Sequence, residues 1–180
     1  SQQMETVPKS HPHNKLLQAR VRMENGDYQT ALELLEPFSP NSDPALLQTQ
    51  AELLFILERY PESLEIWRKL GQYGSLEHAA RVLINDDNLN MANVAWQKAF
   101  EIRPDIYKGI LISHQLMNAK NLREAGDFSA ANDQYQVIID QFPDEAEAYI
   151  GLAQSYWQQG HPDLSISTLD QAMESPSSNY

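Results

Sequence analysis

The 180-residue chain contains no cysteine, which excludes disulfide bonds, thiolate catalysis and cysteine-ligated metal sites. Basic residues are few: 13 Lys and Arg stand against 25 Asp and Glu, a formal net charge of −12. Because this charge repels polyanions, nucleic acids and anionic membranes are not predicted partners. The longest apolar run, Leu53–Leu57, is far shorter than the roughly 20 residues that a membrane-spanning helix needs.

The apolar residues, 42% of the chain with Tyr and Trp included, are numerous enough for a buried core. They recur at intervals of three and four residues and are interrupted by Gly, Pro and Asp, whereas strand-like alternation is missing. The sequence therefore predicts an all-α fold. The expected helices lie near 13–25, 28–38, 45–58, 61–70, 75–85, 88–102, 105–125, 128–141, 145–159 and 162–174.

Short turns divide these helices into pairs. Gly26-Asp27 and Gly126-Asp127 are typical of a helix end followed directly by a helix start, because glycine adopts positive φ easily and aspartate caps the next helix. Gly160-His161-Pro162 has a similar pattern, and Asp43-Pro44 marks another helix start. Tight turns of this kind join antiparallel neighbours.

A repeat emerges when the second helix of each pair is aligned on a small residue. These anchors are Ala31, Ser63, Ala92, Ala131 and Ser165. Twelve residues earlier stands an alanine each time: Ala19, Ala51, Ala80, Ala119 and Ala153. Four residues later stands a large apolar residue: Leu35, Trp67, Trp96, Tyr135 and Leu169. The small residues let paired helices approach closely, and the large one fills the space between pairs. The intervals between anchors are 32, 29, 39 and 34 residues.

This period resembles that of the tetratricopeptide repeat family. Ala92-x3-Trp96-x2-Ala99-x4-Pro104 is similar to the second half of the family's motif, and Tyr149-x2-Leu152-Ala153-x2-Tyr156 to the first half. Tyr135 with Pro143 supports the fourth repeat. The resemblance implies a right-handed superhelical solenoid of about five antiparallel helix pairs. The 29-residue step predicts a shortened second repeat near Gly71–Gly74, and the 39-residue step predicts a longer helix after Asp105.

The predicted organisation is a helical repeat domain over residues 13–176 between two tails. The N-terminal tail is expected over 1–12 and the C-terminal tail over 177–180. The repeats are expected near 12–43, 44–72, 73–106, 107–145 and 146–176. A terminal repeat usually carries a polar outer face, yet Ile166 and Met173 would lie on an open end. Further chain, a second copy or harmless exposure would each account for them.

Motifs of catalysis or cofactor binding are missing. The chain has no Gly-rich phosphate loop, no Gly-x-Ser-x-Gly elbow and no His-Glu-x-x-His pair. Asp86-Asp87 is interpreted as a capping pair before the helix that begins at Asn88. His11 and His13 lack the further ligands of a structural zinc site. We therefore expect no enzyme, no cofactor and no metal.

In a solenoid of helix pairs, the first helices line a concave face. The residues that follow the five alanines, with those four before and three after them, should share that face. Basic and aromatic residues among these positions are the candidate partner-binding set: Arg20, Phe55, Arg81, Lys120, Arg123 and Trp157. Arginine suits a carboxylate, and aromatic side chains are frequent binding hot spots. The alternative is a solvated face whose charges pair with Glu52, Glu77 and Glu124.

The leading hypothesis is a non-catalytic scaffold that binds a partner protein or peptide, with an acidic segment, in this groove. The family's chaperone-binding branch uses a Lys/Asn/Arg clamp; no Asn follows any of the five alanines, so that role is not carried over. Alternatives are an accessory region of a larger enzyme or membrane-associated export or polysaccharide assembly, or a self-assembling module that forms homo-oligomers. We expect a soluble protein, with the compartment left open between cytoplasm and periplasm.

Overall fold

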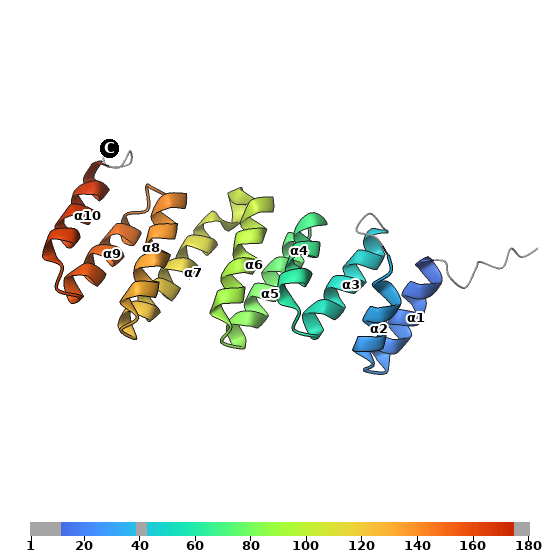
Figure 1. Ribbon diagram of the computed structural model, residues 1–180. Helices are drawn as coiled ribbons and strands as arrows, with labels where there is room; N and C mark the ends of the chain where they lie inside the picture. The colour runs from blue at the N-terminus through green and yellow to red at the C-terminus, as the bar shows by residue number, and fades with distance from the viewer. Residues whose placement is uncertain (1–11, 39–42, 175–180) are drawn as a thin grey trace, which may run out of the picture. The chain divides into compact units, whose positions relative to one another are not determined.

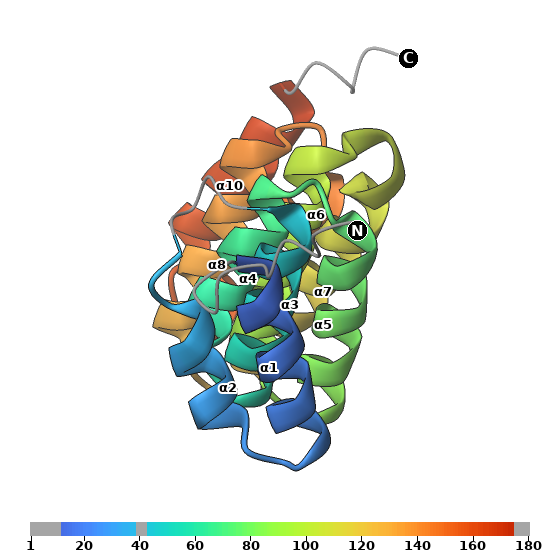
Figure 2. The same ribbon diagram turned by 90° about the vertical axis from the view of Figure 1, so that its right-hand side faces the viewer.

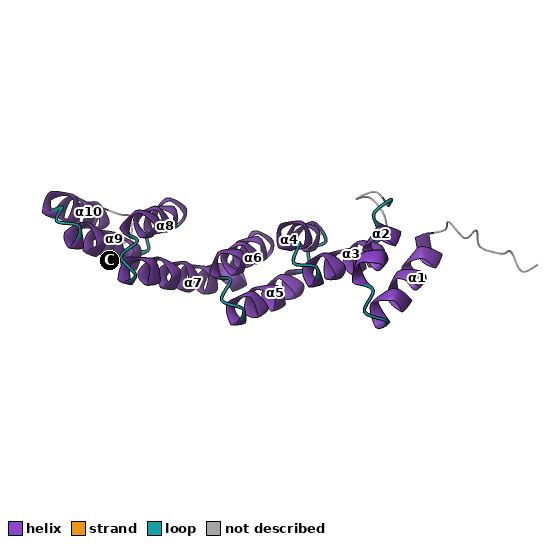
Figure 3. Cartoon of the chain, turned by 60° about the horizontal axis from the view of Figure 1, so that its bottom comes forward, coloured by secondary structure: helices purple, strands orange, loops and turns teal. Residues whose placement is uncertain are grey.

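The computed structural model describes residues 12–38 and 43–174, and over these residues it consists of helices and loops without a strand (Figure 3). The predicted tail residues 1–11 and 177–180 lie outside the described residues. The chain divides into two compact units, Ser1–Pro104 and Asp105–Tyr180.

The first unit contains three helix pairs (Figure 1). They are α1 (Pro12–Glu24) with α2 (Tyr28–Leu35), α3 (Pro44–Ile56) with α4 (Tyr60–Lys69), and α5 (Tyr73–Asn85) with α6 (Leu89–Ile102). Within each pair the two helices pack on each other, and α3 also packs on α1 and α2. Leu35 of α2 shares a buried cluster with Leu46, Leu53 and Leu54 of α3, so the large residue of the first pair is covered by the second pair.

The second unit contains two pairs, α7 (Pro104–Glu124) with α8 (Phe128–Gln141) and α9 (Ala146–Gln158) with α10 (Pro162–Glu174). Helix α9 packs on both α8 and α10. The longer helix expected after Asp105 is α7, which has 21 residues where α1, α3, α5 and α9 have 13. The five pairs and the all-α class are confirmed, and every helix end lies within three residues of its predicted position.

Capping residues explain where several helices begin. The Asp43 carboxylate accepts a hydrogen bond from the Ala45 amide at 2.9 Å, with Pro44 next to it, and the Asp127 carboxylate accepts one from the Ala130 amide at 3.2 Å. The expected cap of α6 by Asp86 and Asp87 is wrong. The side chain of Asn88 caps this helix, because its Oδ1 lies 3.3 Å from the Met91 amide.

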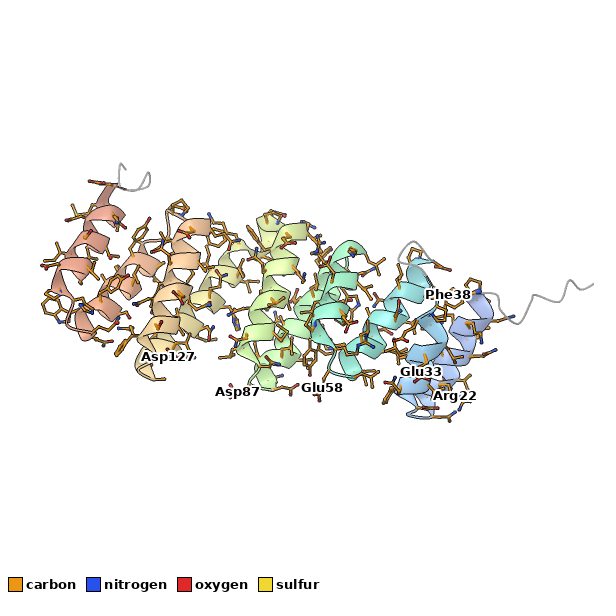
Figure 4. The ribbon with its side chains drawn as sticks, viewed as in Figure 1. Arg22, Glu33, Phe38, Glu58, Asp87 and Asp127 are labelled. Carbon is orange, nitrogen blue, oxygen red and sulfur yellow. The ribbon has the colours of Figure 1, made fainter. Side chains whose placement is uncertain are left out.

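The turns inside the pairs place one residue in the left-handed backbone region. Glycine occupies this place in three pairs, with Gly26 at φ +75°, for example. In the other two pairs, Glu58 and Asp87 stand there, both at φ +59° (Figure 4). Asp87 therefore serves the turn through its positive φ, which a short polar side chain tolerates better than most other side chains do.

The small residues of the repeat lie where the helices of a pair touch. All five anchors and all five alanines twelve positions earlier are buried. In the second pair, the Ser63 hydroxyl donates a hydrogen bond of 2.8 Å to the Ala51 carbonyl, so these two positions are in direct contact. The large residues Trp67 and Trp96 are 4% and 2% exposed, as expected for core residues, but Leu169 is 41% exposed.

Candidate functional site

Three of the six predicted site residues lie in the first unit, each on the first helix of a pair. Arg20 on α1 is exposed, and its side chain has no ion-pair or hydrogen-bond partner within residues 12–38 and 43–174. Arg81 on α5 is exposed but already engaged: its guanidinium lies 2.9 Å from the Glu77 carboxylate and 5.9 Å from the ring centre of Trp96. Arg81 therefore fits the alternative interpretation, in which the basic residues of this face pair with neighbouring carboxylates.

Phe55 on α3 is half-buried within an aromatic cluster. Its ring centre lies 5.1 Å from that of Tyr60 and 5.5 Å from that of Trp67. Much of the ring is therefore used to pack α3 against α4. This leaves Phe55 less surface for a partner than an exposed aromatic residue would have.

The second unit holds Lys120, Arg123 and Trp157. Lys120 is exposed on α7 and pairs with Glu124 at 3.8 Å, again as the alternative of paired charges expects. Arg123, one turn further along α7, and Trp157 on α9 line the same open hollow of about 520 Å³. Sequence reasoning thus selected two residues that the structure brings together.

This α9–α10 hollow has apolar walls and one basic residue. Ile150, Trp157 and Leu169 are 46%, 65% and 41% exposed, so each presents apolar surface to an incoming group. The residues that line the hollow are Arg123, Ile150, Ala153, Gln154, Trp157, Gln158, Ser165 and Leu169. None of these lining residues is acidic, although the whole chain carries a charge of −12.

Tyr135 of α8 is a neighbour of Arg123. The Tyr135 ring is buried, and its hydroxyl interacts with the Arg123 guanidinium. Burial raises the pKa of Tyr135 above its usual range, and the neighbouring positive charge of Arg123 partly offsets that rise. The Nε atom of Arg123 is buried and has no hydrogen-bond partner among the described residues.

Tyr135 is in turn held by Gly151 of α9. A Cβ atom at position 151 would overlap the Tyr135 ring, so the ring lies directly on the glycine backbone. Gly151, Tyr135 and Arg123 thus form a contact chain from the core to the hollow. Sequence reasoning missed the roles of Gly151 and Leu169. The exposed position of Leu169 follows from its place in the last pair of the described residues.

Metal binding and membrane spanning were also considered for the described residues outside the hollow. Among the described residues, no group of three or more His, Asp and Glu side chains could hold a metal ion. Within the same residues, no helix combines the length and apolar character needed to cross a membrane. His114 on α7 is half-buried, and burial lowers its pKa, which favours the neutral imidazole near neutral pH.

The geometry is that of an all-α protein built from antiparallel helix pairs, in which each pair repeats the same contact between small residues. A family model described as tetratricopeptide repeat matches residues 116–179, from the later part of α7 to beyond α10. This part of the chain is similar to the tetratricopeptide repeat family. Such proteins are in general non-catalytic scaffolds for protein interactions. A search of curated protein sequences finds no match.

Several solved structures are similar to this chain. YrrB, described as a TPR protein with an unusual peptide-binding site, shares 16% identity over 92% of this chain and 87% of its own, with a TM-score of 0.36. MamA shares 15% identity over 87% of this chain and 92% of its own, with a TM-score of 0.39. A tetratricopeptide repeat protein from Parabacteroides merdae ATCC 43184 shares 16% identity over 95% of this chain and 68% of its own, with a TM-score of 0.40. At these values the likenesses carry no functional inference.

Proposed function

We propose that the protein is a non-catalytic scaffold that binds a peptide segment of a partner protein at the α9–α10 hollow. The segment presents an apolar side chain next to a carboxylate, from Asp, Glu or a chain end. The observation that carries this proposal is the combination of three exposed apolar walls with Arg123, a single cation, in a hollow whose lining residues include no acid.

Each part of that ligand matches one part of the hollow. The apolar side chain packs between Trp157 and Leu169, where burial contributes about 25 cal/mol for each Å² removed from water. The carboxylate accepts hydrogen bonds from Arg123, whose planar guanidinium suits it.

The other predicted residues have smaller roles in this proposal. Lys120 attracts acidic residues that flank the bound segment, after releasing its weak pair with Glu124. Arg20 and Arg81 offer carboxylate contacts on the first unit, and Phe55 offers the exposed part of its ring. We assign the main affinity to Arg123 and Trp157, because these two line one hollow.

A peptide selection tests the proposal. A library of random displayed peptides is selected on the wild-type chain, and the enriched peptides are then titrated against variants. We expect an enriched pattern of an apolar residue next to Asp, Glu or the free C-terminus. Trp157→Ala should weaken binding by about 2 kcal/mol, roughly 30-fold, as for an aromatic hot spot. Arg123→Gln should weaken it mainly for peptides with the carboxylate.

The control is Leu164→Ala, which truncates an apolar residue of α10 that is 49% exposed and does not line the hollow. It should leave peptide affinity unchanged. All three variants are first shown to keep wild-type helical content. Enriched peptides that bind Trp157→Ala as well as wild type would place the binding surface away from the hollow.

A further inference from the structure

The α9–α10 hollow has a serine hydroxyl at its floor. Ala153 of α9 and Ser165 of α10 are the most buried of its lining residues, at 2% and 6% exposed. Helix α10 is labelled in Figures 1 and 2, and it packs on α9. Within residues 12–38 and 43–174, the Ser165 hydroxyl has no hydrogen-bond partner. The floor therefore offers a polar group that the fold itself does not use.

Two other hydroxyls show how such a group is usually satisfied in this chain. Ser63, at the same repeat position in the second pair, is fully buried and donates a hydrogen bond of 2.8 Å to the Ala51 carbonyl. Thr168 of α10 donates one of 2.8 Å to the Leu164 carbonyl of its own helix. Among the described residues, Ser165 makes neither kind of bond. Its hydroxyl keeps one donor and two acceptor sites for a ligand.

The walls beside this hydroxyl favour an aromatic ligand group. Trp157 is 65% exposed and Leu169 is 41% exposed, and both line the hollow. An aromatic ring can meet the indole of Trp157 in a stacked or edge-to-face arrangement, which adds affinity beyond that of the buried area. An aliphatic side chain gains only the buried area. The walls therefore suit a ring, and the floor suits a polar atom at the end of that ring.

We propose that the hollow selects a tyrosine as the apolar anchor of the bound peptide segment. The tyrosine ring packs between Trp157 and Leu169, and its hydroxyl forms a hydrogen bond with the Ser165 hydroxyl. The neighbouring carboxylate of the segment binds Arg123. This inference rests on the function proposed above and identifies the side chain that the hollow prefers.

Phenylalanine and leucine match the walls but not the floor. Either side chain would keep water away from the Ser165 hydroxyl without supplying a partner, and a buried hydroxyl without a partner costs free energy. A site that contains such a group rejects ligands that cannot pair with it. We expect tyrosine to be preferred over phenylalanine by about two- to tenfold, which corresponds to the net contribution of one hydrogen bond.

Matched peptides test this preference. Three displayed libraries carry a fixed tyrosine, phenylalanine or leucine next to a glutamate, with random flanking positions, and each is selected on the wild-type chain. The best binders are synthesised as twins that differ only in tyrosine or phenylalanine at the fixed position. Fluorescence titration then gives the Kd of each twin. The tyrosine twin should bind about two- to tenfold more tightly. Equal or weaker binding of the tyrosine twin would overturn the proposal.

Ser165→Ala removes the hydroxyl from the floor. Alanine already stands at this repeat position in three other pairs, as Ala31, Ala92 and Ala131, so the variant should fold. It should bind the two twins with similar affinity, because the phenylalanine twin no longer leaves a hydroxyl unpaired. A tyrosine preference that the variant retains in full would contradict the role of Ser165.

Ser63→Ala is the matched control, because it makes the same change at the same repeat position outside the hollow. It should keep the wild-type preference for tyrosine, and a preference lost in this variant as well would contradict the assignment to Ser165. Helical content and melting temperature are measured for both alanine variants, so that a change of preference is not confused with loss of the fold.

Trp157→Ala separates this inference from the function on which it rests. Peptides that depend on Trp157 but bind equally well as tyrosine and phenylalanine twins would overturn the tyrosine anchor and leave the proposed function in place. If no peptide from the three libraries depends on Trp157, both the proposed function and the tyrosine anchor are wrong.

Discussion

At the scale of single residues, Gly151 is the position on α9 where the helix backbone packs against a buried aromatic ring. The Tyr135 ring lies on its backbone, and the Tyr135 hydroxyl interacts with Arg123. Glycine inside a helix normally costs about 1 kcal/mol relative to alanine. Position 151 accepts that cost because a larger residue would displace a buried ring.

We therefore predict that Gly151→Ala destabilises the protein by about 1–3 kcal/mol, the usual range for overpacking a buried contact. Gly109→Ala in α7 is the matched control, because a Cβ atom there meets nothing within 4 Å. This second variant should be stabilised by about 0.5–1 kcal/mol through helix propensity. Denaturant unfolding measures both. Equal effects of the two substitutions would mean that Tyr135 does not rest on Gly151.

At the scale of helices, the close contact within each pair depends on small residues. Ala119 and Ala131 are fully buried, and they hold the equivalent places on α7 and α8. A longer side chain at either place must push the helices apart. The contact stabilises the pair through packing. Ion pairs on the surface therefore contribute less to the stability of the fold.

Ala131→Leu should destabilise the fold by about 1–3 kcal/mol, because the added carbons have no space. Ser129→Leu, two residues earlier on the exposed side of α8, adds a leucine without overpacking and should stay within about 0.5 kcal/mol of wild type. Thermal or denaturant unfolding gives the comparison. An unchanged stability of Ala131→Leu would show that the assigned repeat register is wrong.

Helices α4 and α6 are joined by charged groups around Glu65. Its carboxylate lies 2.7 Å from both the Arg68 guanidinium and the Lys98 ammonium, and Arg68 also lies 3.7 Å from Glu101. Hydrogen bonds from Arg68 and then Lys98 lower the pKa of Glu65 to about 2, against an ordinary value of 4.5. The ionised carboxylate thus stabilises the folded state, since the unfolded chain holds its proton more tightly.

This stabilisation is fully present above pH 4.5 and declines as the pH falls toward 2. Since the Glu65 side chain is 34% exposed, screening by water limits it to about 1 kcal/mol. Glu65→Gln should therefore be less stable than wild type at neutral pH, and the difference should shrink as the pH approaches 2. Urea unfolding at several pH values tests this. A difference that is independent of pH would assign the effect of Glu65 to packing instead.

At the scale of the whole molecule, the sequence predicts the helices better than it predicts the candidate site. Helix ends follow from local signals such as Asp43-Pro44 and Gly126, so they could be placed within a few residues. The groove positions follow from periodicity alone. Periodicity cannot tell that Phe55 packs on Tyr60 and Trp67, because that depends on how three side chains turn toward one another.

The exposure of the large repeat residue is another property that sequence periodicity cannot predict. Leu169 has the same place in the motif as Trp67, yet only Trp67 is buried, because burial depends on what packs against the helix. Likewise, Arg123 and Tyr135 are neighbours on two different helices, and no local sequence pattern indicates that they lie together. The hollow is therefore a property of packing between pairs, which the motif residues do not encode.

The most direct test of the central claim, that the α9–α10 hollow is the binding surface, is affinity capture from a lysate of the organism of origin. Wild type is compared with Arg123→Gln/Trp157→Ala, with Leu164→Ala as the control, and captured proteins are identified by mass spectrometry. We predict a partner that wild type and Leu164→Ala retain and the double variant loses. A partner retained equally by all three proteins would contradict the account.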